Sequence, residues 1–416
     1  MKQKCRLFFI FFLIVTILTG TVSSCVTDVN AIDETDVSIT TISADELGGE
    51  STDTKAEAPE FHVEAKSAIL IEAETGTVLY AFNEHESLPI ASITKIMTML
   101  LVMEALDSGK IKTSDITTVS AHASQMGGSQ VYLKEGETFT VEELLKAVAV
   151  HSANDASVAL AEMIAGTEDA FVSMMNNKAA ELGMKNTKFL DCTGLTDEGH
   201  YSSAYDVALM SRELLIKHPR IIHYTTIWHD TFRDGKFDLD NTNKLIKRYR
   251  GTTGLKTGFT RAAGFCLSAS AERDGTKFIS VILGAKTNDE RFSESARLLD
   301  YAFSNWESAK IQKKGLEAGK VKVRKGVISE ITVNFAEDAV VVVKKGSREK
   351  ITETLEIPEI INAPVKAGQA VGVLNIDLDG KRLASIPVVA SQDSQRCTFG
   401  LAFGMVIQRW TKLFCE

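Results

Sequence analysis

The sequence predicts an α+β domain with an antiparallel sheet and a helical cluster, followed by a small all-β domain and a C-terminal amphipathic helix. Three observations support this fold class. Strand-like patterns occur at both ends of region 59–306, with helical periodicity between them. In region 307–391 only short β-type runs remain, separated by turn residues. In region 392–416 apolar residues recur at spacings of three, four and seven.

The first domain is expected to begin with a β-hairpin and to end with strands and a helix. Residues 67–72 and 78–81 have strand character, and Gly76 supplies the turn between them. Thr140 and Glu143 form a capping-box pattern, which marks the start of a helix. Helical patterns occur at about 91–106, 140–151, 154–165, 168–183, 204–217 and 293–303, and strand patterns at 252–257, 264–271 and 278–284.

The second domain is expected to consist of short strands with turns between them. The strand patterns lie at 321–324, 328–335, 339–343, 351–357, 371–378 and 383–389. Turn residues such as Gly346 and Gly380 separate these runs. The region contains no cluster of residues that carry chemistry, so we expect a spacer or an interaction role.

The C-terminal segment has a wide apolar stripe on one face of its expected helix. The stripe consists of Phe399, Phe403, Val406, Ile407, Trp410, Leu413 and Phe414, with Arg396, Arg409 and Lys412 off it. The apolar run is too short to span a bilayer. Aromatic residues beside cations on an amphipathic helix favour an anchor lying in the membrane surface, and the alternative is a helix that packs on the β-domain.

The N-terminal residues have the pattern of an export signal. Basic residues precede the apolar run 7–18, which is shorter than a membrane-spanning helix. Cleavage after Ala31 would remove a signal peptide of residues 1–31, and the alternative is lipidation of Cys25, because 22–25 resembles a bacterial lipobox. Residues 32–58 are acidic and lack apolar periodicity, which favours a disordered linker. Both routes place the mature protein at the extracytoplasmic face of the membrane.

Charge and cysteine usage narrow the classes of partner. The net charge of −9 comes largely from the acidic linker, so nothing indicates a nucleic-acid partner. Of the six cysteines, only Cys192 and Cys266 fall inside the first domain, and no paired metal-ligand spacing occurs. We expect these two side chains to be buried and to behave as small apolar groups.

Three short motifs in the first domain carry the chemistry: Ser-x-x-Lys at 92–95, Ser-x-Asn at 152–154 and Lys-Thr-Gly at 256–258. Each is weak alone, because Ser-x-x-Lys also occurs at 347–350 in a charged turn of the β-domain. Ser92 differs in lying at the start of a strongly apolar helix, whose free N–H groups favour developing negative charge. Lys95 follows one turn later on the same face.

A serine hydroxyl needs a nearby base before it can act as a nucleophile. Lys95 can accept the proton of Ser92 only if a good fraction of the lysine is neutral. Burial and a second cation both lower the pKa of a lysine, and Lys256 is the natural second cation. The spacing therefore predicts a serine nucleophile with a lysine base.

The remaining motif residues are of the types that bind a peptide substrate. Ser152 and Asn154, at the junction of two helices, would relay a proton and orient an amide. Lys256 and Thr257 would bind a carboxylate, and Gly258 would let a substrate backbone lie against the strand. Taken singly, each residue also has a structural explanation as a helix cap, a solvated side chain or a turn. The three motifs together, in this order, favour catalysis.

With their flanking residues, the motifs resemble the serine D-alanyl-D-alanine carboxypeptidases, which are low-molecular-mass penicillin-binding proteins. The resemblance rests on Ala-Ser-Ile-Thr-Lys-Ile-Met-Thr at 91–98, Ser-Ala-Asn-Asp-Ala-Ser at 152–157 and Gly-Leu-Lys-Thr-Gly-Phe-Thr at 254–260. It covers about residues 60–416. It implies that 59–306 has the fold shared by penicillin-binding proteins and serine β-lactamases.

The resemblance also implies a reaction. Ser92 would attack the penultimate D-Ala of a peptidoglycan pentapeptide stem, the terminal D-Ala would leave, and water would hydrolyse the acyl-enzyme. The N–H groups of Ser92 and Phe259 would form the oxyanion hole, and Arg291 would assist carboxylate binding. Penicillins would trap Ser92 as a slow ester, and no metal or cofactor is implied.

Two departures from the family pattern and two histidines have no assigned role. Phe259 stands where several relatives have histidine, although only its backbone is needed, and Cys192 is unusual before Thr-Gly-Leu. His151 and His200 lie near the motifs, and we expect structural placement for both. The alternative functions are a serine β-lactamase, a peptidoglycan DD-endopeptidase that cleaves cross-links and, from another class, a non-catalytic cell-wall scaffold.

Overall fold

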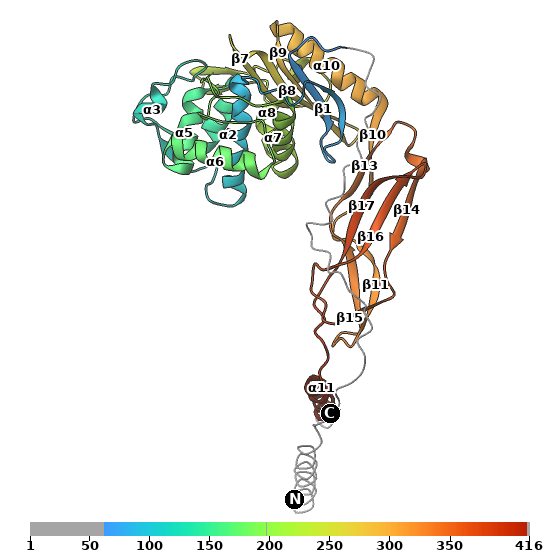
Figure 1. Cartoon of the computed structure of the whole chain (residues 1–416). Helices are drawn as coiled ribbons and strands as arrows, with labels where there is room; N and C mark the ends of the chain where they lie inside the picture. The colour runs from blue at the N-terminus through green and yellow to red at the C-terminus, as the bar shows by residue number, and fades with distance from the viewer. Residues whose placement is uncertain (1–61, 197, 414–416) are drawn as a thin grey trace, which may run out of the picture. The chain divides into compact units, whose positions relative to one another are not determined.

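The computed structural model describes residues 62–196 and 198–413, and its elements are shown in Figure 1. The expected signal peptide (1–31), the lipidation alternative at Cys25 and the acidic linker (32–58) lie outside the described residues.

The first domain is built on a five-stranded antiparallel sheet in the order β2-β1-β9-β8-β7. The strands are β1 (Ser67–Glu72), β2 (Val78–Phe82), β7 (Thr252–Thr260), β8 (Gly264–Arg273) and β9 (Thr276–Ala285). The N-terminal hairpin joins the three later strands through the pairing of β1 with β9, in which Ser67 lies opposite Leu283. The expected α+β class with an antiparallel sheet is therefore confirmed.

The helices cover both faces of this sheet. Alternate residues of β1 explain the layering: Ile69 and Ile71 pack in the large helical core, whereas Leu70 packs with Leu298 and Leu299 of α10. Figure 1 shows α10 across the sheet from α2 and α7. The helical segments are η1 (Ala91–Thr94), α2 (Lys95–Asp107), α3 (Ala121–Ser124), α4 (Val141–Lys146), η2 (Ala147–His151), α5 (Asn154–Ala165), α6 (Glu168–Glu181), α7 (Ala204–Lys217), α8 (Ile221–Thr225), α9 (Leu245–Arg248) and α10 (Asn288–Asn305).

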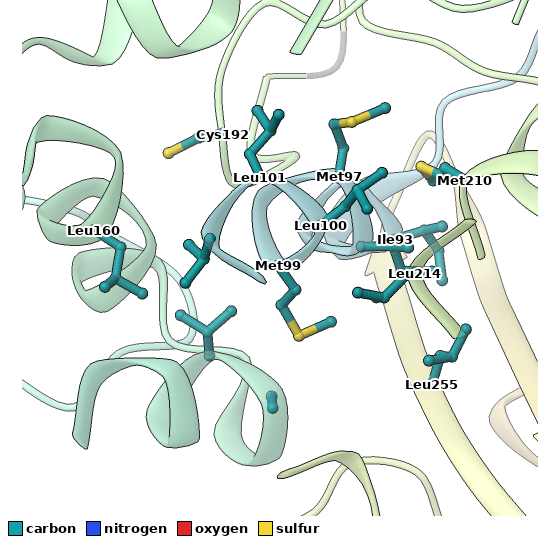
Figure 2. Close-up of a cluster of buried hydrophobic side chains, with 14 of the residues drawn as sticks. Ile93, Met97, Met99, Leu100, Leu101, Leu160, Cys192, Met210, Leu214 and Leu255 are labelled. Atoms are coloured by element: carbon teal, nitrogen blue, oxygen red, sulfur yellow. The ribbon is translucent and has the colours of Figure 1, made fainter. Parts of the chain in front are cut away.

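Helix α2 lies at the centre of the helical core. It is apolar on nearly every side, which is the pattern of a helix surrounded by protein. Figure 2 shows its side chains directed toward Leu160 of α5, Leu214 of α7 and Leu255 of β7. A central helix fixed in this way holds the residues at its N-terminus in place.

The local starts and stops of the helices follow the capping signals. Thr140 and Glu143 form the expected capping box. Helix α10 begins before the expected residue 293, because Thr287 and Glu290 form a second capping box. Two short antiparallel strand pairs were not predicted: β3 (Ile116–Thr118) with β4 (Thr138–Thr140), and the hairpin of β5 (His229–Phe232) with β6 (Phe237–Asp240).

The second domain is all-β, as expected. A six-stranded sheet has the order β14-β16-β17-β12-β11-β15, and β10 pairs separately with β13. The strands are β10 (Trp306–Gln312), β11 (Glu317–Arg324), β12 (Glu330–Phe335), β13 (Ala339–Lys344), β14 (Ile351–Glu356), β15 (Ile360–Asn362), β16 (Ala370–Leu378) and β17 (Lys381–Ala390). The second Ser-x-x-Lys pattern falls on an exposed 3₁₀ turn, η3 (Arg348–Lys350), with no helix after it.

The chain after β17 runs along the β-domain before the last helix begins. Ser394 is buried, and its hydroxyl donates to the carbonyl of Ile328 at 2.9 Å. The amide of Cys397 donates to the carbonyl of Lys325 at 2.7 Å. Helix α11 (Phe399–Leu413) follows, with exposed apolar side chains at Phe399, Leu401, Phe403, Met405, Val406 and Ile407. Within the described residues, no helix is both long and apolar enough to cross a membrane.

Candidate active site

Ser92 lies in a tight turn, and two glycines approach the backbone of this turn closely. The turn is η1, and the hydroxyl of Thr94 closes it by donating to the carbonyl of Ala91 at 2.8 Å. A β-carbon on Gly194 would lie 1.9 Å from the Ala91 carbonyl oxygen. A β-carbon on Gly258 would lie 2.6 Å from the Ile90 carbonyl oxygen. Only glycine therefore lets the neighbouring loop and strand β7 approach the Ser92 turn this closely.

Lys95 is fully buried at the first turn of α2 and points at the serine. Its Nζ donates to Ser92 Oγ at 3.1 Å, Asn154 Oδ1 at 2.6 Å and the carbonyl of Thr193 at 2.7 Å. None of these acceptors is a carboxylate. Burial lowers the pKa of Lys95 to about 8. A shift of that size costs on the order of 3 kcal/mol in the charged form, so a useful fraction of the amine is neutral near physiological pH.

Lys256 is the second buried lysine, on strand β7. Its Nζ donates to the carbonyl of Thr257 at 3.0 Å. Burial, followed by the charges of Lys95 and Arg291, holds the pKa of Lys256 well below its ordinary value. Two buried lysines that repel each other do not both stay fully charged. Lys95 is therefore one of the charges that lower the pKa of Lys256, whereas the lowered pKa of Lys95 comes from burial and not from Lys256.

Ser152 and Asn154 lie where segment η2 meets helix α5. Ser152 has a left-handed backbone, with φ of 66°, and its buried Oγ has no hydrogen-bond partner among the described residues. Asn154 bridges two parts of the site, because its Oδ1 accepts from Lys95 and its Nδ2 donates to the carbonyl of Gly127 at 2.7 Å. The unpartnered hydroxyl of Ser152 is free to bond a substrate.

Strand β7 carries Thr257 and Phe259, and Arg291 of α10 contacts this strand. Thr257 Oγ1 donates to Thr242 Oγ1 at 2.7 Å. The Phe259 ring is 54% exposed and stacks on Phe265 with ring centres 4.3 Å apart. Arg291 is buried, and it donates to the backbone carbonyl of Gly258 at 2.9 Å, so it braces the strand that carries the Lys-Thr-Gly motif. Burial lowers the pKa of Arg291 to about 10.

The hydrogen bonds join some of the expected residues directly and others through the backbone. Ser92, Lys95 and Asn154 form one connected group. Strand β7, with Lys256, Thr257 and Phe259, reaches this group through the contact of Gly258 with the Ser92 turn. Arg291 touches the strand but none of the side chains in the connected group.

Sequence reasoning missed the loop that supplies the third acceptor for Lys95. Asp191 fixes this loop by accepting from the amides of Thr193 at 2.7 Å, Gly194 at 2.5 Å and Thr196 at 2.9 Å. Burial alone would raise the pKa of Asp191, but the hydrogen bonds from Thr196 and Thr193 and the nearby His200 hold it well below its usual range. Asp191 accepts from the amides two and three residues further on, which is the Asx-turn pattern, so this role could have been inferred from an aspartate two residues before Thr-Gly.

His200, Cys192 and Cys266 occupy buried positions, and His151 is partly buried. His200 is buried behind the Ser92 turn, where its Nε2 lies 2.8 Å from Thr94 Oγ1 and its Nδ1 accepts from the amide of Leu190. Cys192 and Cys266 are free thiols and fully buried, as expected. Among residues 62–196 and 198–413, no group of three histidine, cysteine or acidic side chains is placed to hold a metal ion.

Comparison with known proteins places this geometry in a family. The family described as D-alanyl-D-alanine carboxypeptidase matches residues 52–287, and the penicillin-binding protein 5 C-terminal domain matches 306–396. The D-alanyl-D-alanine carboxypeptidase DacF of Bacillus subtilis is 48% identical over 353 residues, covering 84% of this chain and 90% of that protein.

Solved structures agree with these relatives. Penicillin-binding protein 5 of Haemophilus influenzae is 32% identical, with a TM-score of 0.73 over 80% of this chain and 98% of the other. The ampicillin-bound penicillin-binding protein D2 of Listeria monocytogenes is 33% identical, with a TM-score of 0.54 over 59% of this chain and 99% of the other. The chain therefore belongs to the serine-type D-alanyl-D-alanine carboxypeptidases and is an enzyme with the fold of the low-molecular-mass penicillin-binding proteins.

Proposed function

We propose that this chain removes the terminal D-Ala from peptidoglycan pentapeptide stems through an acyl-enzyme on Ser92. One observation carries the proposal: the buried Nζ of Lys95 lies 3.1 Å from Ser92 Oγ, with no carboxylate among its hydrogen-bond partners. A lysine in that environment is a base near neutral pH, and the hydroxyl beside it is the group it activates. Membership of a family that acts on D-Ala-D-Ala termini supplies the substrate class.

The first half of the reaction forms the acyl-enzyme. Neutral Lys95 takes the proton of Ser92 as the oxygen attacks the carbonyl of the penultimate D-Ala. The N–H groups of Ser92 and Phe259 stabilise the oxyanion that develops. The terminal D-Ala leaves as an amine, and the proton that Lys95 took from Ser92 reaches this amine through the hydroxyl of Ser152, which restores neutral Lys95. Water then hydrolyses the ester and restores the serine.

The substrate carboxylate is held at the Lys-Thr-Gly strand. Lys256 and Thr257 are consecutive residues on β7, and in this proposal they offer an ammonium and a hydroxyl to the terminal carboxylate. Arg291 acts in this proposal through its hydrogen bond to the Gly258 carbonyl and through its charge, which adds to the positive potential of the site. Asn154, already bonded to Lys95, orients the scissile amide.

Penicillins are proposed as slow substrates of the same serine. Their strained amide would acylate Ser92, and the ampicillin-bound Listeria relative supports this assignment. A serine β-lactamase would use the same three motifs but would hydrolyse the ester quickly, and an endopeptidase would prefer cross-linked peptides. The family match to carboxypeptidases favours removal of D-Ala over the β-lactamase and endopeptidase activities. Because the family consists of enzymes, the match also disfavours a non-catalytic cell-wall scaffold.

The direct test is D-Ala release from a purified pentapeptide ending in D-Ala-D-Ala. The proposal expects one D-Ala per peptide, leaving a tetrapeptide, and little cleavage of a cross-linked dimeric peptide under the same conditions. Faster cleavage of the cross-linked peptide would favour the endopeptidase. Hydrolysis of penicillin with no release of D-Ala would favour the β-lactamase.

Acylation is expected to depend on pH through Lys95. The neutral amine is the active form, so the rate rises with pH and levels off above the pKa of about 8. Below that value the neutral fraction, and hence the rate, falls about tenfold for each pH unit. The measurement is the second-order rate constant for penicillin acylation across this range. A flat profile below pH 8 would mean that another group is the base.

We further propose that the signal sends the protein out of the cytoplasm and that α11 holds it at the membrane surface. In this organisation 1–31 is the signal, 32–58 the linker, 59–306 the catalytic domain, 307–391 the β-domain and 392–416 the anchor. The support for the anchor is the exposed apolar surface of α11, because isolated apolar side chains are common at protein surfaces but continuous ones indicate an interaction.

Vesicle binding tests the anchor. The double variant Phe403→Glu, Val406→Glu places two charges on the exposed apolar surface and should weaken sedimentation with anionic phospholipid vesicles at least about tenfold. Leu355→Glu changes an exposed apolar residue on β14 of the β-domain; it is the control and should bind as the unchanged protein does. Equal binding by all three proteins would contradict the anchor.

A further inference from the structure

Tyr132 has an unusual backbone for a large side chain. Its φ is +56°, in the left-handed region that non-glycine residues seldom adopt, and its side chain is 63% exposed. A bulky residue in this conformation persists only when its surroundings impose it, and such residues gather at functional sites.

Two charged side chains hold the backbone of Tyr132. The carboxylate of Asp155, which is fully buried, accepts from the amides on both sides, Val131 at 3.1 Å and Leu133 at 3.0 Å. Arg233, at the tip of the β5–β6 hairpin, donates to the Tyr132 carbonyl at 2.7 Å and pairs with Glu137. The hydrogen bonds from the flanking amides to Asp155 and from Arg233 to the carbonyl therefore hold Tyr132 in this strained conformation.

The same contacts tie Tyr132 to the active site. Asp155 directly follows Asn154, and the backbone N–H of Asn154 donates to the carbonyl of Ser129 at 2.7 Å. The loop that carries Tyr132 therefore runs along the start of α5, where Asn154 bonds Lys95. The loop of Tyr132 and the Asn154 side chain therefore lie on the same part of the site.

An aromatic wall extends from Tyr132 toward Ser152. The ring centre of Tyr132 lies 6.0 Å from that of Phe237 in an edge-to-face contact. Phe237 in turn lies 5.4 Å from the ring of His151, also edge to face. His151 immediately precedes Ser152, and the buried Nδ1 of His151 has no hydrogen-bond partner among the described residues. The exposed ring of Tyr132 is thus continuous with the site.

We propose that Tyr132 and Phe237 form a binding subsite for the aliphatic side chain of the residue that precedes D-Ala-D-Ala in the stem peptide. The inference rests on the proposed function, in which Lys256 and Thr257 hold the terminal carboxylate on β7. A peptide fixed there at its C-terminus extends past Asn154 toward the loop of Tyr132. An exposed aromatic ring, held rigidly, offers apolar contact at little cost in conformational entropy.

Three substitutions of Tyr132 in the full chain separate contact from loop shape. Tyr132→Phe keeps the ring, and Tyr132→Ala and Tyr132→Gly both remove it. Glycine adopts a φ of +56° without strain, whereas alanine adopts it only at a cost in backbone energy, so the glycine variant should be the more stable to heat of the two. If the ring binds substrate, both lose about tenfold in kcat/KM for a pentapeptide, chiefly through KM, and the phenylalanine variant does not.

A second substrate tests the position of the subsite. N-acetyl-D-Ala-D-Ala lacks the preceding residue, so its kcat/KM should be nearly the same in all four proteins. Equal losses on both substrates, or full pentapeptide activity in the glycine variant, would overturn the subsite. If the unchanged protein releases D-Ala but Tyr132 variants match it, only the subsite fails. If the unchanged protein releases no D-Ala and forms no penicillin adduct, the proposed function itself fails.

Discussion

Replacing Lys95 with methionine is expected to lower the rate of penicillin acylation by about 10³-fold or more, because the proposed mechanism uses Lys95 as the base that takes the proton of Ser92. Methionine has a similar length and fits an apolar helix, so the surrounding core should stay packed. The measurement is the rate at which the penicilloyl adduct forms, followed by mass spectrometry. Lys350→Met, in the Ser-x-x-Lys pattern of the β-domain, is the matched control and should acylate normally.

Folding should survive this substitution, and thermal unfolding checks it. The variant no longer buries an ammonium beside Lys256, which favours the folded state. It also leaves Asn154 Oδ1 and the carbonyl of Thr193 without the donor that Lys95 supplied, which destabilises the folded state. These effects have opposite signs, so Tm should change little. Acylation by a well-folded variant at near the original rate would show that Lys95 is not the base.

Replacing Gly194 with alanine should disable the site through geometry alone. The new β-carbon would meet the carbonyl oxygen of Ala91, 1.9 Å away, at a residue whose φ is +79°. The backbone strain and the overlap together cost about 3 kcal/mol or more. The Ser92 turn must move to relieve the overlap, and a displacement of about 1 Å lowers a reaction rate on the order of 10²-fold.

Gly109→Ala is the matched control for this prediction. Gly109 has almost the same backbone, with φ of +74°, but nothing lies within 4 Å of its would-be β-carbon. The backbone strain should lower the free energy of unfolding of this variant by only about 1 kcal/mol, and acylation should stay normal. Tm and the acylation rate of both variants provide the comparison. If the two behaved alike, the contact between Gly194 and the Ser92 turn would not matter.

Much of the fold could be predicted because its signals are local. The hairpin at 67–82, the capping box at Thr140 and the strands around 252–284 each depend on residues close in sequence. The helix expected at 91–106 is present, but it starts as a 3₁₀ turn that carries Ser92. The short strand pairs β3–β4 and β5–β6 were not predicted because strands of three or four residues have too little periodicity to be recognised.

The site could be predicted only as far as its motifs reach. The sequence indicates that Lys95 and Ser92 share a helix face, but the acceptor on Thr193 lies 98 residues away along the chain. The left-handed backbone of Ser152 and the clamp on Tyr132 also depend on tertiary contacts. Arg291 was expected at the substrate carboxylate, and the structure shows its guanidinium on the carbonyls of Gly258 and Cys266.

Intact-mass spectrometry of the protein with penicillin over time tests the account most directly, with Ser92→Ala beside it. The account predicts a lasting adduct of one penicillin per chain that is absent from the variant. Rapid loss of penicillin without a lasting adduct would mean fast deacylation and a β-lactamase. An adduct that persists in Ser92→Ala, or no adduct and no hydrolysis in either protein, would contradict the assignment of Ser92 as the nucleophile.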